Sequence, residues 1–111
     1  MPIKKDIRKN FRDSVFRRDC YTCKYCGVGP YYLNTEEHLD AHHITDRSNI
    51  PNGGYVKENG ISLCKNSCHM KAEKFHMTDG VEWETNMHPD DLYKLIGSSK
   101  VEATQTSKKL K

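Results

Sequence analysis

The chain has 111 residues, of which only 35% are hydrophobic, and its mean hydropathy is −0.87. That length suits one domain, and so thin an apolar core usually needs a staple such as a disulfide, a metal ion or a partner subunit. The sequence has neither an apolar leader nor an apolar run of membrane-spanning length, so we expect an intracellular protein. Outside a secretory context, its five cysteines favour metal ligation over disulfides.

The net charge of +3 conceals a strong asymmetry along the chain. Residues 1–18 carry seven Lys and Arg against two Asp, and residues 100–111 carry four Lys against one Glu. The segment between them has seven basic and twelve acidic residues. Two basic ends around an acidic centre predict a polyanionic partner that the ends bind, and the alternative is that both ends are simply solvated.

The first predicted element is an amphipathic basic helix over residues 3–18. Apolar residues recur there every fourth position, while the Lys and Arg residues lie mostly off that face. The segment "CYTCKYCG" that follows suits a short hairpin, and "GVGPYY" suits a turn.

The middle of the chain reads as strand, loop, strand and helix. "HLDAHHI" and "ISLC" are predicted strands, and the Gly-, Pro- and Asn-rich segment 45–60 is the loop between them. "SCHMKAEKFHM" is rich in helix formers, with Ser67 as a candidate N-cap. "HPDDLYKLIGSS" predicts a short helix, because Pro and two acids open it and Gly97 follows its end. Residues 99–111 are polar and aperiodic, and we predict a disordered basic tail.

Four cysteines form two close pairs. Cys23 and Cys26 are spaced C-x2-C before a glycine, and Cys64 and Cys68 are spaced C-x3-C. Each spacing lets two sulfurs reach one ion from a tight turn, so the two pairs together predict a structural Zn²⁺ site. Cys20 also forms a C-x2-C with Cys23, and the sequence leaves open whether Cys20 replaces one of the ligands. We favour Cys23 and Cys26, because the glycine that follows them permits a tight turn, and expect Cys20 to be a small, partly buried apolar residue.

A second group of polar residues surrounds the pair "HH". His69 falls in the first turn of the predicted helix, and Glu73 lies four residues later on the same face. With His42 they would form a divalent-metal site with open positions. A regular strand sends His42 and His43 to opposite faces, so the two share one site only if the strand ends or bends there. His76 is a reserve ligand, and His38 and His88 are read as surface histidines.

The stretches "VFRRDCYTCKYCG", "AHHI", "ENGISLC" and "CHMKAE" resemble the HNH endonucleases, the cysteine-stapled ββα-metal nucleases of phages and mobile elements. The likeness runs over residues 15–75, and "HPDDLYKLIGSS" is similar to a tail segment of phage members. It implies an α+β, zinc-stapled ββα-metal fold in one domain over residues 1–98. That domain would comprise the basic helix 3–18, a zinc knuckle and ββα core over 19–77, and a C-terminal segment 78–98.

The resemblance also implies a role for each polar residue. His43 would be the general base, and Asn59 would orient it. His42 and His69 would bind the catalytic divalent ion, Mg²⁺, Mn²⁺ or Ni²⁺, together with Glu73. Family members usually have C-x2-C before the last histidine, so the C-x3-C here makes the start of the helix, and the aim of His69, a point for the structure to decide.

The expected activity is hydrolysis of DNA phosphodiester bonds, with DNA bound mostly through its backbone. Arg47, just past the histidines, would clamp a phosphate or be a plain surface charge. A phage packaging protein is a candidate partner, and a bacterial host's cytoplasm is the expected compartment. Trp83, Tyr31, Tyr32 and Tyr55 are interpreted as packing residues. Cleavage specificity, nicking versus double-strand cutting and oligomeric state stay open.

Two other classes of function compete with this interpretation. A noncatalytic zinc-stapled nucleic-acid-binding module would keep the cysteines and the basic ends but would have no use for His43. A redox or disulfide protein would explain the cysteines alone, and the ordered succession of Cys, His and Asn residues argues against it.

Overall fold

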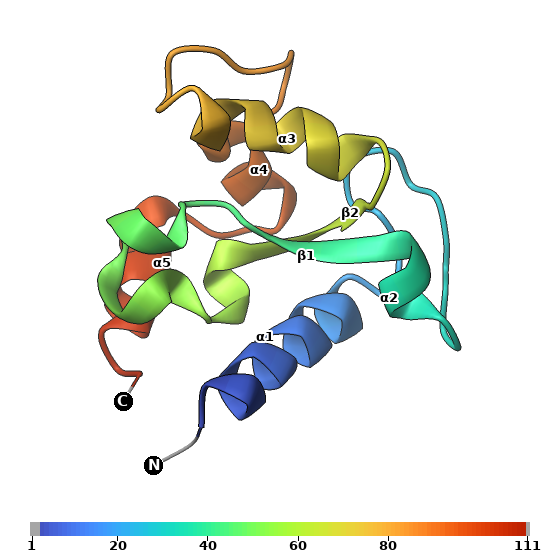
Figure 1. Cartoon of the computed structure of the whole chain (residues 1–111), viewed down its shortest axis with the longest axis horizontal. Helices are drawn as coiled ribbons and strands as arrows, with labels where there is room; N and C mark the ends of the chain where they lie inside the picture. The colour runs from blue at the N-terminus through green and yellow to red at the C-terminus, as the bar shows by residue number, and fades with distance from the viewer. Residues whose placement is uncertain (1–2, 111) are drawn as a thin grey trace.

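The computed structural model describes residues 3–110 and has an α+β architecture in which a two-stranded antiparallel sheet lies between helices (Figure 1). Strand β1 (Leu39–His43) pairs with β2 (Gly60–Cys64), and helix α1 (Lys4–Arg18) contacts the sheet on the opposite side from α3 (Cys68–Met77). The remaining helices are α2 (Thr35–His38), α4 (Pro89–Leu95) and α5 (Lys100–Ser107). None of the described helices is long and apolar enough to cross a membrane.

The register of the sheet places the two histidines on its two faces. His42 pairs with Ile61 and His43 pairs with Gly60, the first residue of β2. His43 stacks on Phe11 of α1, with ring centroids 4.5 Å apart, whereas His42 packs against histidine rings of α3. The strand therefore alternates as a regular strand must.

Close packing of α1 on the sheet depends on a glycine. A Cβ atom at Gly60 would lie 2.8 Å from the Phe11 ring and would also collide with Val15. With no side chain there, α1 can bury Phe11, Val15 and Phe16 directly against the strands. The structure thus confirms the predicted basic helix, and the apolar face of this helix packs against the sheet.

The described chain departs from the sequence prediction in two segments. Around "CYTCKYCG" there is no hairpin: Cys20 and Tyr21 have φ near +55°, and the backbone forms tight turns instead of strands.

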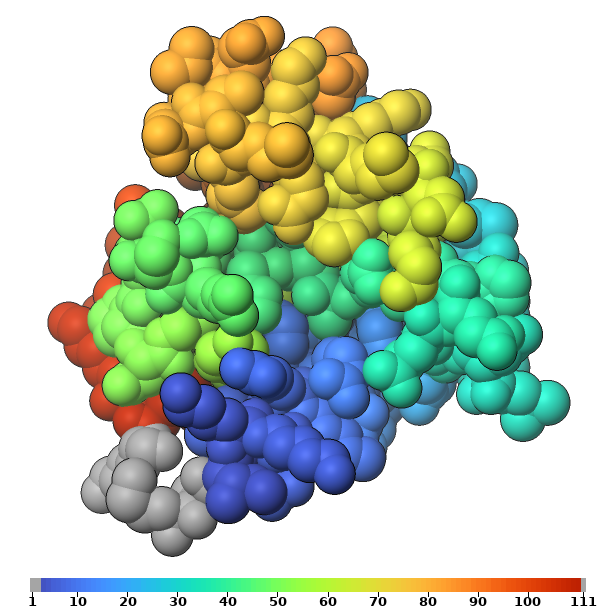
Figure 2. All heavy atoms as spheres, in the orientation of Figure 1, coloured from blue at the N-terminus to red at the C-terminus, as the bar shows by residue number. Residues whose placement is uncertain are grey.

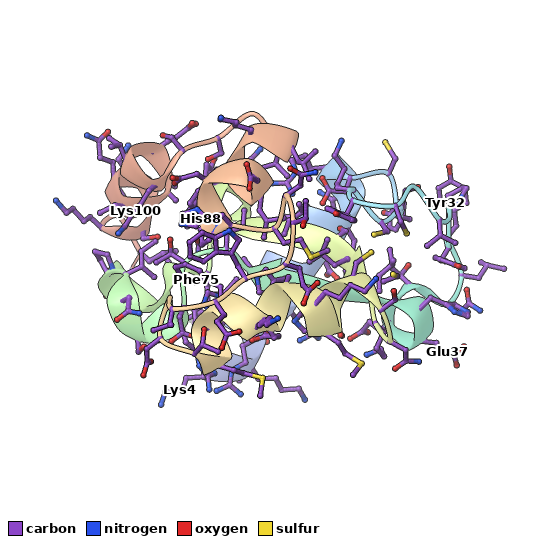
Figure 3. All side chains as sticks on the ribbon, turned by 90° about the horizontal axis from the view of Figure 1, so that it is seen from above. Lys4, Tyr32, Glu37, Phe75, His88 and Lys100 are labelled. Carbon is purple, nitrogen blue, oxygen red and sulfur yellow. The ribbon has the colours of Figure 1, made fainter. Side chains whose placement is uncertain are left out.

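The aromatic residues are also less buried than expected, because Trp83 and Tyr32 are exposed. Trp83 packs instead at the surface with His88 and Phe75, and the latter two are labelled side by side in Figure 3.

The second departure is the C-terminal segment, where the expectation of a disordered tail over residues 99–111 is wrong for the part described. Residues 100–107 form α5, and the Ser99 hydroxyl caps it by accepting a hydrogen bond from the Glu102 N–H at 3.0 Å. Ala103 is completely buried in the core. The Asn52 amide donates hydrogen bonds to the backbone carbonyls of Ser107 and Leu110 at 2.9 and 3.0 Å. Two small buried residues, Ala103 and Ser107, and loop contacts hold this helix, and such a pattern has no apolar periodicity that sequence analysis could detect.

Packing of α5 can be tested with one substitution made at two positions. Ala103→Leu forces extra volume into a filled core and should lower the free energy of unfolding by about 1–3 kcal/mol. Gln105→Leu, at an exposed position of the same helix, should change it by less than about 0.5 kcal/mol. Urea denaturation followed by circular dichroism gives both values. Equal effects of the two substitutions would mean that α5 is not docked.

Candidate functional site

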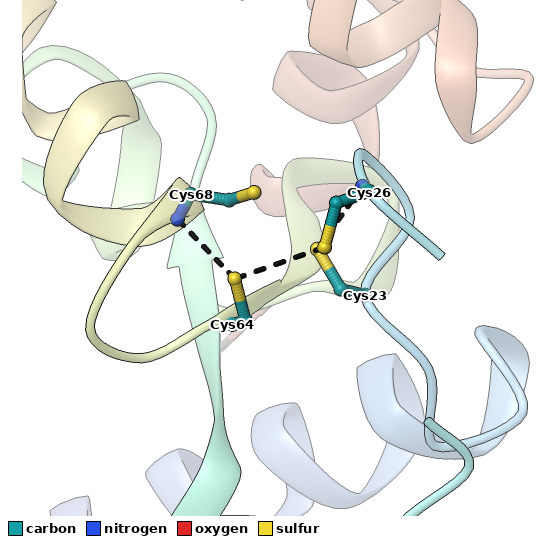
Figure 4. A group of neighbouring side chains, drawn as sticks. All are labelled: Cys23, Cys26, Cys64 and Cys68. Carbon is teal, nitrogen blue, oxygen red and sulfur yellow. Dashed lines mark hydrogen bonds between the residues drawn. The ribbon is translucent and has the colours of Figure 1, made fainter. Parts of the chain in front are cut away.

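The four paired cysteines converge at one end of the sheet. Cys23 and Cys26 come from the turn after α1, Cys64 ends β2 and Cys68 begins α3 (Figure 4). The four sulfur atoms all lie within 4.8 Å of one another. Two backbone N–H groups point at sulfurs, Cys26 N at 3.5 Å from Cys23 Sγ and Cys68 N at 3.3 Å from Cys64 Sγ. The group has the donors to hold one metal ion.

Electrostatics of this cluster also favour a cation at its centre. Burial opposes ionisation of Cys23, but backbone N–H groups that face its sulfur outweigh burial and lower its pKa. Burial and the sulfur of Cys64 raise the pKa of Cys68. Sulfurs so close together cannot all ionise unless a positive charge compensates them. None of the five cysteines is in a disulfide, so all four sulfurs are available as ligands.

Cys20 lies outside this cluster, which settles the ambiguity between the overlapping C-x2-C pairs. Its side chain is exposed, not partly buried as expected, and its nearest polar partner is the carbonyl of Arg18 at 4.0 Å. Gly27 has φ +82°, the left-handed conformation that closes the turn after Cys26. This conformation follows the Cys23–Cys26 pair, so the glycine was a valid sequence signal.

The second cluster joins His42 from β1 with His69 and Glu73 from α3. Their ligand atoms lie within 4.8 Å of one another, and this group could also hold a metal ion. Helix α3 begins at Cys68 despite the C-x3-C spacing, so His69 sits in its first turn and Glu73 one turn later. His69 Nε2 is 2.9 Å from Glu73 Oε1.

Asp40 orients His69 from the neighbouring strand. His69 Nδ1 donates to Asp40 Oδ2 at 2.7 Å, and Lys65 Nζ donates to the other oxygen at 2.8 Å. Burial would lower the pKa of His69, but its hydrogen bonds to Glu73 and Asp40 and their charges raise it. A metal-binding histidine characteristically gives its second nitrogen to a carboxylate in this way, which leaves Nε2 directed at the cluster. Asp40 was missed in the sequence, although it precedes His42 by two residues on the same strand face.

His42 supplies a nitrogen without a hydrogen-bond partner. The residue is 2% exposed, and its Nδ1 lies 3.4 Å from Glu73 Oε1 without forming a hydrogen bond. Burial lowers the pKa of His42, so its ring is neutral near pH 7 and its lone pair is free. The close approach of the His42 and His69 rings holds the pKa of Glu73 well below its usual range. A buried imidazole nitrogen without a partner, beside an ionised carboxylate, fits a ligand set for a divalent cation.

His43 lies next to this cluster but belongs to neither ligand group. Its ring is stacked on Phe11 and meets Tyr55 edge-on at 4.8 Å. Burial lowers its pKa to about 4, and the charge of Arg47 acts in the same direction. Its Nε2 has no hydrogen-bond partner among the described residues. His43 is therefore a neutral base over the whole physiological pH range.

His42 and His43 line the same hollow, which has a volume of about 290 Å³. Its other lining residues include His69 and Glu73 of α3, and Asp46 and Arg47 of the loop after β1. Figure 2 shows this face hollowed between α3, the loop after β1 and α1. Strand β1 ends at His43, and for that reason side chains from opposite faces of the sheet reach the same space. Arg47, exposed at the rim, donates to the Tyr55 hydroxyl at 3.3 Å.

Asn59 acts on the backbone, not on the ring of His43. Its Oδ1 accepts hydrogen bonds from Thr45 N at 2.9 Å and the Tyr93 hydroxyl at 2.7 Å, and its Nδ2 donates to the carbonyls of Thr45 and Gly54. All four hydrogen-bonding positions of the amide are used, and within residues 3–110 none goes to His43. The expected contact with the base is replaced by control of the turn that follows it.

His76, expected as a reserve ligand, and Tyr93, which sequence analysis did not assign to the site, hold His43 and its turn. His76 Nε2 donates to the backbone carbonyl of His43 at 2.8 Å, so this nitrogen is committed and His76 is outside the ligand group. Tyr93 of α4, which is 2% exposed, bonds both Asn59 and the Thr45 hydroxyl. No local sequence signal links Tyr93 to a loop 48 residues earlier.

Orientation of His69 by Asp40 predicts a measurable loss of metal affinity. Asp40→Asn keeps an acceptor for His69 but removes its charge, and should weaken divalent-metal binding at the His42–His69–Glu73 group about 10–100-fold. Asp13→Asn, which removes an exposed carboxylate paired with Lys9, is the matched control and should leave the affinity unchanged. Isothermal titration calorimetry with Mn²⁺ measures both. Unaltered affinity in Asp40→Asn would show that the carboxylate does not orient a ligand.

Comparisons with protein-family models, with curated proteins and with solved structures found no match to this chain. The functional assignment therefore depends on the geometry of the two ligand groups and of the hollow.

Proposed function

We propose that the protein is a metal-dependent nuclease of the HNH type, which hydrolyses phosphodiester bonds of nucleic acid in the hollow between α1 and α3. The observation that carries this proposal is the meeting of three kinds of group there. A metal-ligand group, a neutral histidine outside it and an exposed arginine all line one solvent-accessible space. A purely structural metal site would not need the second and third.

His43 is the proposed general base. Because its pKa is lowered to about 4, the ring is unprotonated near pH 7 and can accept the proton of an attacking water. Phe11 fixes the ring plane by stacking, and His76 fixes the backbone carbonyl of the same residue. Such a base needs no reorganisation before reaction, because both its plane and its backbone are held.

The ligands His42, His69 and Glu73 would hold the divalent ion, Mg²⁺, Mn²⁺ or Ni²⁺. When bound, such an ion supplies Lewis-acid stabilisation of negative charge on the phosphate and on the leaving oxygen. Arg47, on the opposite rim, would bind a non-bridging phosphate oxygen. Glu73 and Asp40 both form hydrogen bonds to His69 and so do not neutralise Arg47. Arg47 would therefore be free to bind the substrate phosphate.

The cysteine cluster is proposed to bind structural zinc. A Zn–S distance of about 2.3 Å places the ligand sulfurs of a tetrahedron about 3.8 Å apart. Cys26 Sγ and Cys64 Sγ are 3.9 Å apart, close to that edge length. Zinc there would join the turn after α1, the end of β2 and the start of α3, and would supply stability that the thin apolar core lacks.

The zinc proposal predicts different outcomes for two exposed cysteines. Cys26→Ser removes a ligand and should abolish one equivalent of bound zinc and the cooperative thermal transition, because binding energy of a structural zinc is folding energy of the order of 10 kcal/mol. Cys20→Ser should leave the zinc content and the transition unchanged. Elemental analysis measures the zinc content, and differential scanning calorimetry measures the thermal transition. A folded parent protein without zinc, or a Cys26→Ser variant that retains it, contradicts the proposal.

The two histidines of β1 should fail in different ways. His43→Ala should bind divalent metal and DNA normally while cleavage falls by roughly 10²–10⁴-fold. His42→Ala should weaken metal binding itself, with partial recovery of the rate at excess metal. Plasmid cleavage with Mg²⁺, Mn²⁺ and Ni²⁺ measures the rates, calorimetry measures the affinities, and His38→Ala, at an exposed position, is the control.

The pH dependence follows from the lowered pKa of His43. Protonation inactivates the base, so at saturating metal the rate should fall only at pH values below the ordinary histidine pKa of about 6.5. Normal cleavage by metal-loaded His43→Ala would reject His43 as the base. Tight nucleic-acid binding without cleavage by any of these ions would favour the noncatalytic binding module.

A further inference from the structure

We propose that a basic furrow beside the catalytic hollow, running along α1, binds an unpaired nucleotide next to the cleaved phosphate, so that the protein prefers single-stranded nucleic acid to duplex. The furrow comprises two adjoining hollows of about 450 and 400 Å³. This inference depends on the proposed function only in taking the His43 hollow as the position of the cleaved phosphate.

The furrow is continuous with the catalytic hollow. Its first part shares His43, Ala41 and Arg47 with that hollow. Its second part shares Arg8, Arg47 and Tyr55 with the first and reaches Lys4 near the start of α1. A strand that leaves the catalytic hollow past Arg47 therefore meets the furrow next. Figure 2 shows α1 along the lower border of the hollowed face.

The charges of the furrow are of one sign. No Asp or Glu lines either of its parts, whereas Lys4, Arg8, Arg12 and Arg47 do. Arg12 is paired with Glu36 at 3.0 Å, but the other three cations form no ion pair with any carboxylate of residues 3–110. Unneutralised cations in a row beside a phosphate-binding position favour further phosphates of the same strand.

The lining between those cations is apolar and partly aromatic. In the second part, Ile7, Leu110 and the ring of Tyr55 line the hollow together with the basic side chains. The ring of Tyr55 is fixed, because it packs edge-on against Phe11 at 5.7 Å and a Cβ atom at Gly53 would lie 2.6 Å from it. A rigid aromatic ring binds a flat ligand at little cost in conformational entropy.

Together these features fit a nucleotide whose base is not paired. A basic groove with aromatic side chains is the common device by which proteins bind single strands, since phosphates meet the cations and bases pack on the rings. Bases of a duplex are stacked on both faces and cannot enter an apolar hollow without being unpaired. Duplex DNA has the higher charge density, so charge alone would favour duplex, and only occupation of the apolar part reverses that order.

The preference is tested by fluorescence anisotropy with the full, metal-loaded chain in the His43→Ala background, which prevents cleavage during the titration. The probes are a labelled DNA strand, the same strand in duplex, and an RNA strand of the same sequence. The single DNA strand should bind about 10-fold more tightly than the duplex at equal salt. The RNA strand identifies the preferred sugar, and its binding in excess of duplex also agrees with the furrow. Duplex binding as tight as that of either single strand overturns the proposal.

Variants then locate the bound strand. Arg8→Ala should lower the slope of log affinity against log salt by about 0.7, because one phosphate contact to a single strand is lost. Arg17→Ala removes an equally exposed cation of α1 outside the furrow and should leave the slope unchanged. Tyr55→Leu should weaken single-strand binding about 10-fold and duplex binding little, while Tyr55→Phe keeps the ring and the affinity. If Tyr55→Leu fails to fold, the comparison of Arg8→Ala with Arg17→Ala still tests the proposal. Equal salt slopes for these two variants overturn it.

Cleavage by the otherwise unmodified chain distinguishes this inference from the proposed function. Single-strand preference and a slope that depends on Arg8, without cleavage by any divalent ion, would uphold the furrow and reject the nuclease. Cleavage of duplex and single strands with equal efficiency, unaffected by Arg8→Ala, would uphold the nuclease and reject the furrow.

Discussion

The buried amide of Asn59 is the interaction on which the candidate site depends. Its four hydrogen bonds tie the turn after β1 to Gly54 and, through the Tyr93 hydroxyl, to α4. The Asn59 carbonyl also accepts a hydrogen bond from Ile44 N at 2.8 Å. These bonds end the strand at His43, so a side chain from each face of the sheet reaches one hollow. Because the amide is fully buried, removing any partner would leave an unsatisfied polar group at a cost of about 1–3 kcal/mol.

The two ligand groups are mechanically linked through α3. Cys68 and His69 are adjacent residues that open this helix, and each belongs to a different group. A metal ion in the cysteine cluster would therefore fix the helix start, and with it the direction of His69. Asp40 adds a second constraint from β1, since it bonds His69 across the strand–helix interface. The site is built from rigid elements at both ends, which is the arrangement that keeps ligand geometry precise.

Charge is distributed around the hollow according to the element that supplies it. The α3 side contributes the ionised Glu73, and β1 contributes Asp40, so cations are attracted there. The α1 side and the loop after β1 contribute Lys4, Arg8 and Arg47, which pair with no carboxylate of residues 3–110 and attract anions. Helix α1 thus has two faces of different character. Its apolar face is buried in the core and stacks on His43, and its basic face borders the furrow.

The sequence by itself determined the elements with strong local patterns: the basic helix, both strands, α3 and α4, and the two cysteine pairs, whose short spacing limits them to one ion. It also placed His69 and Glu73 on one helix face, because helical spacing is a local rule, and the order of strand, loop, strand and helix suggested His42 as their neighbour. The tertiary structure alone decided the ordering of α5 and the roles of Asp40, Tyr93 and Asn59, and it excluded Cys20 from the ligand group, as the glycine after Cys26 had favoured. Those outcomes arise from contacts between segments distant in sequence, where burial and hydrogen-bond geometry, rather than any periodic pattern, choose the partner.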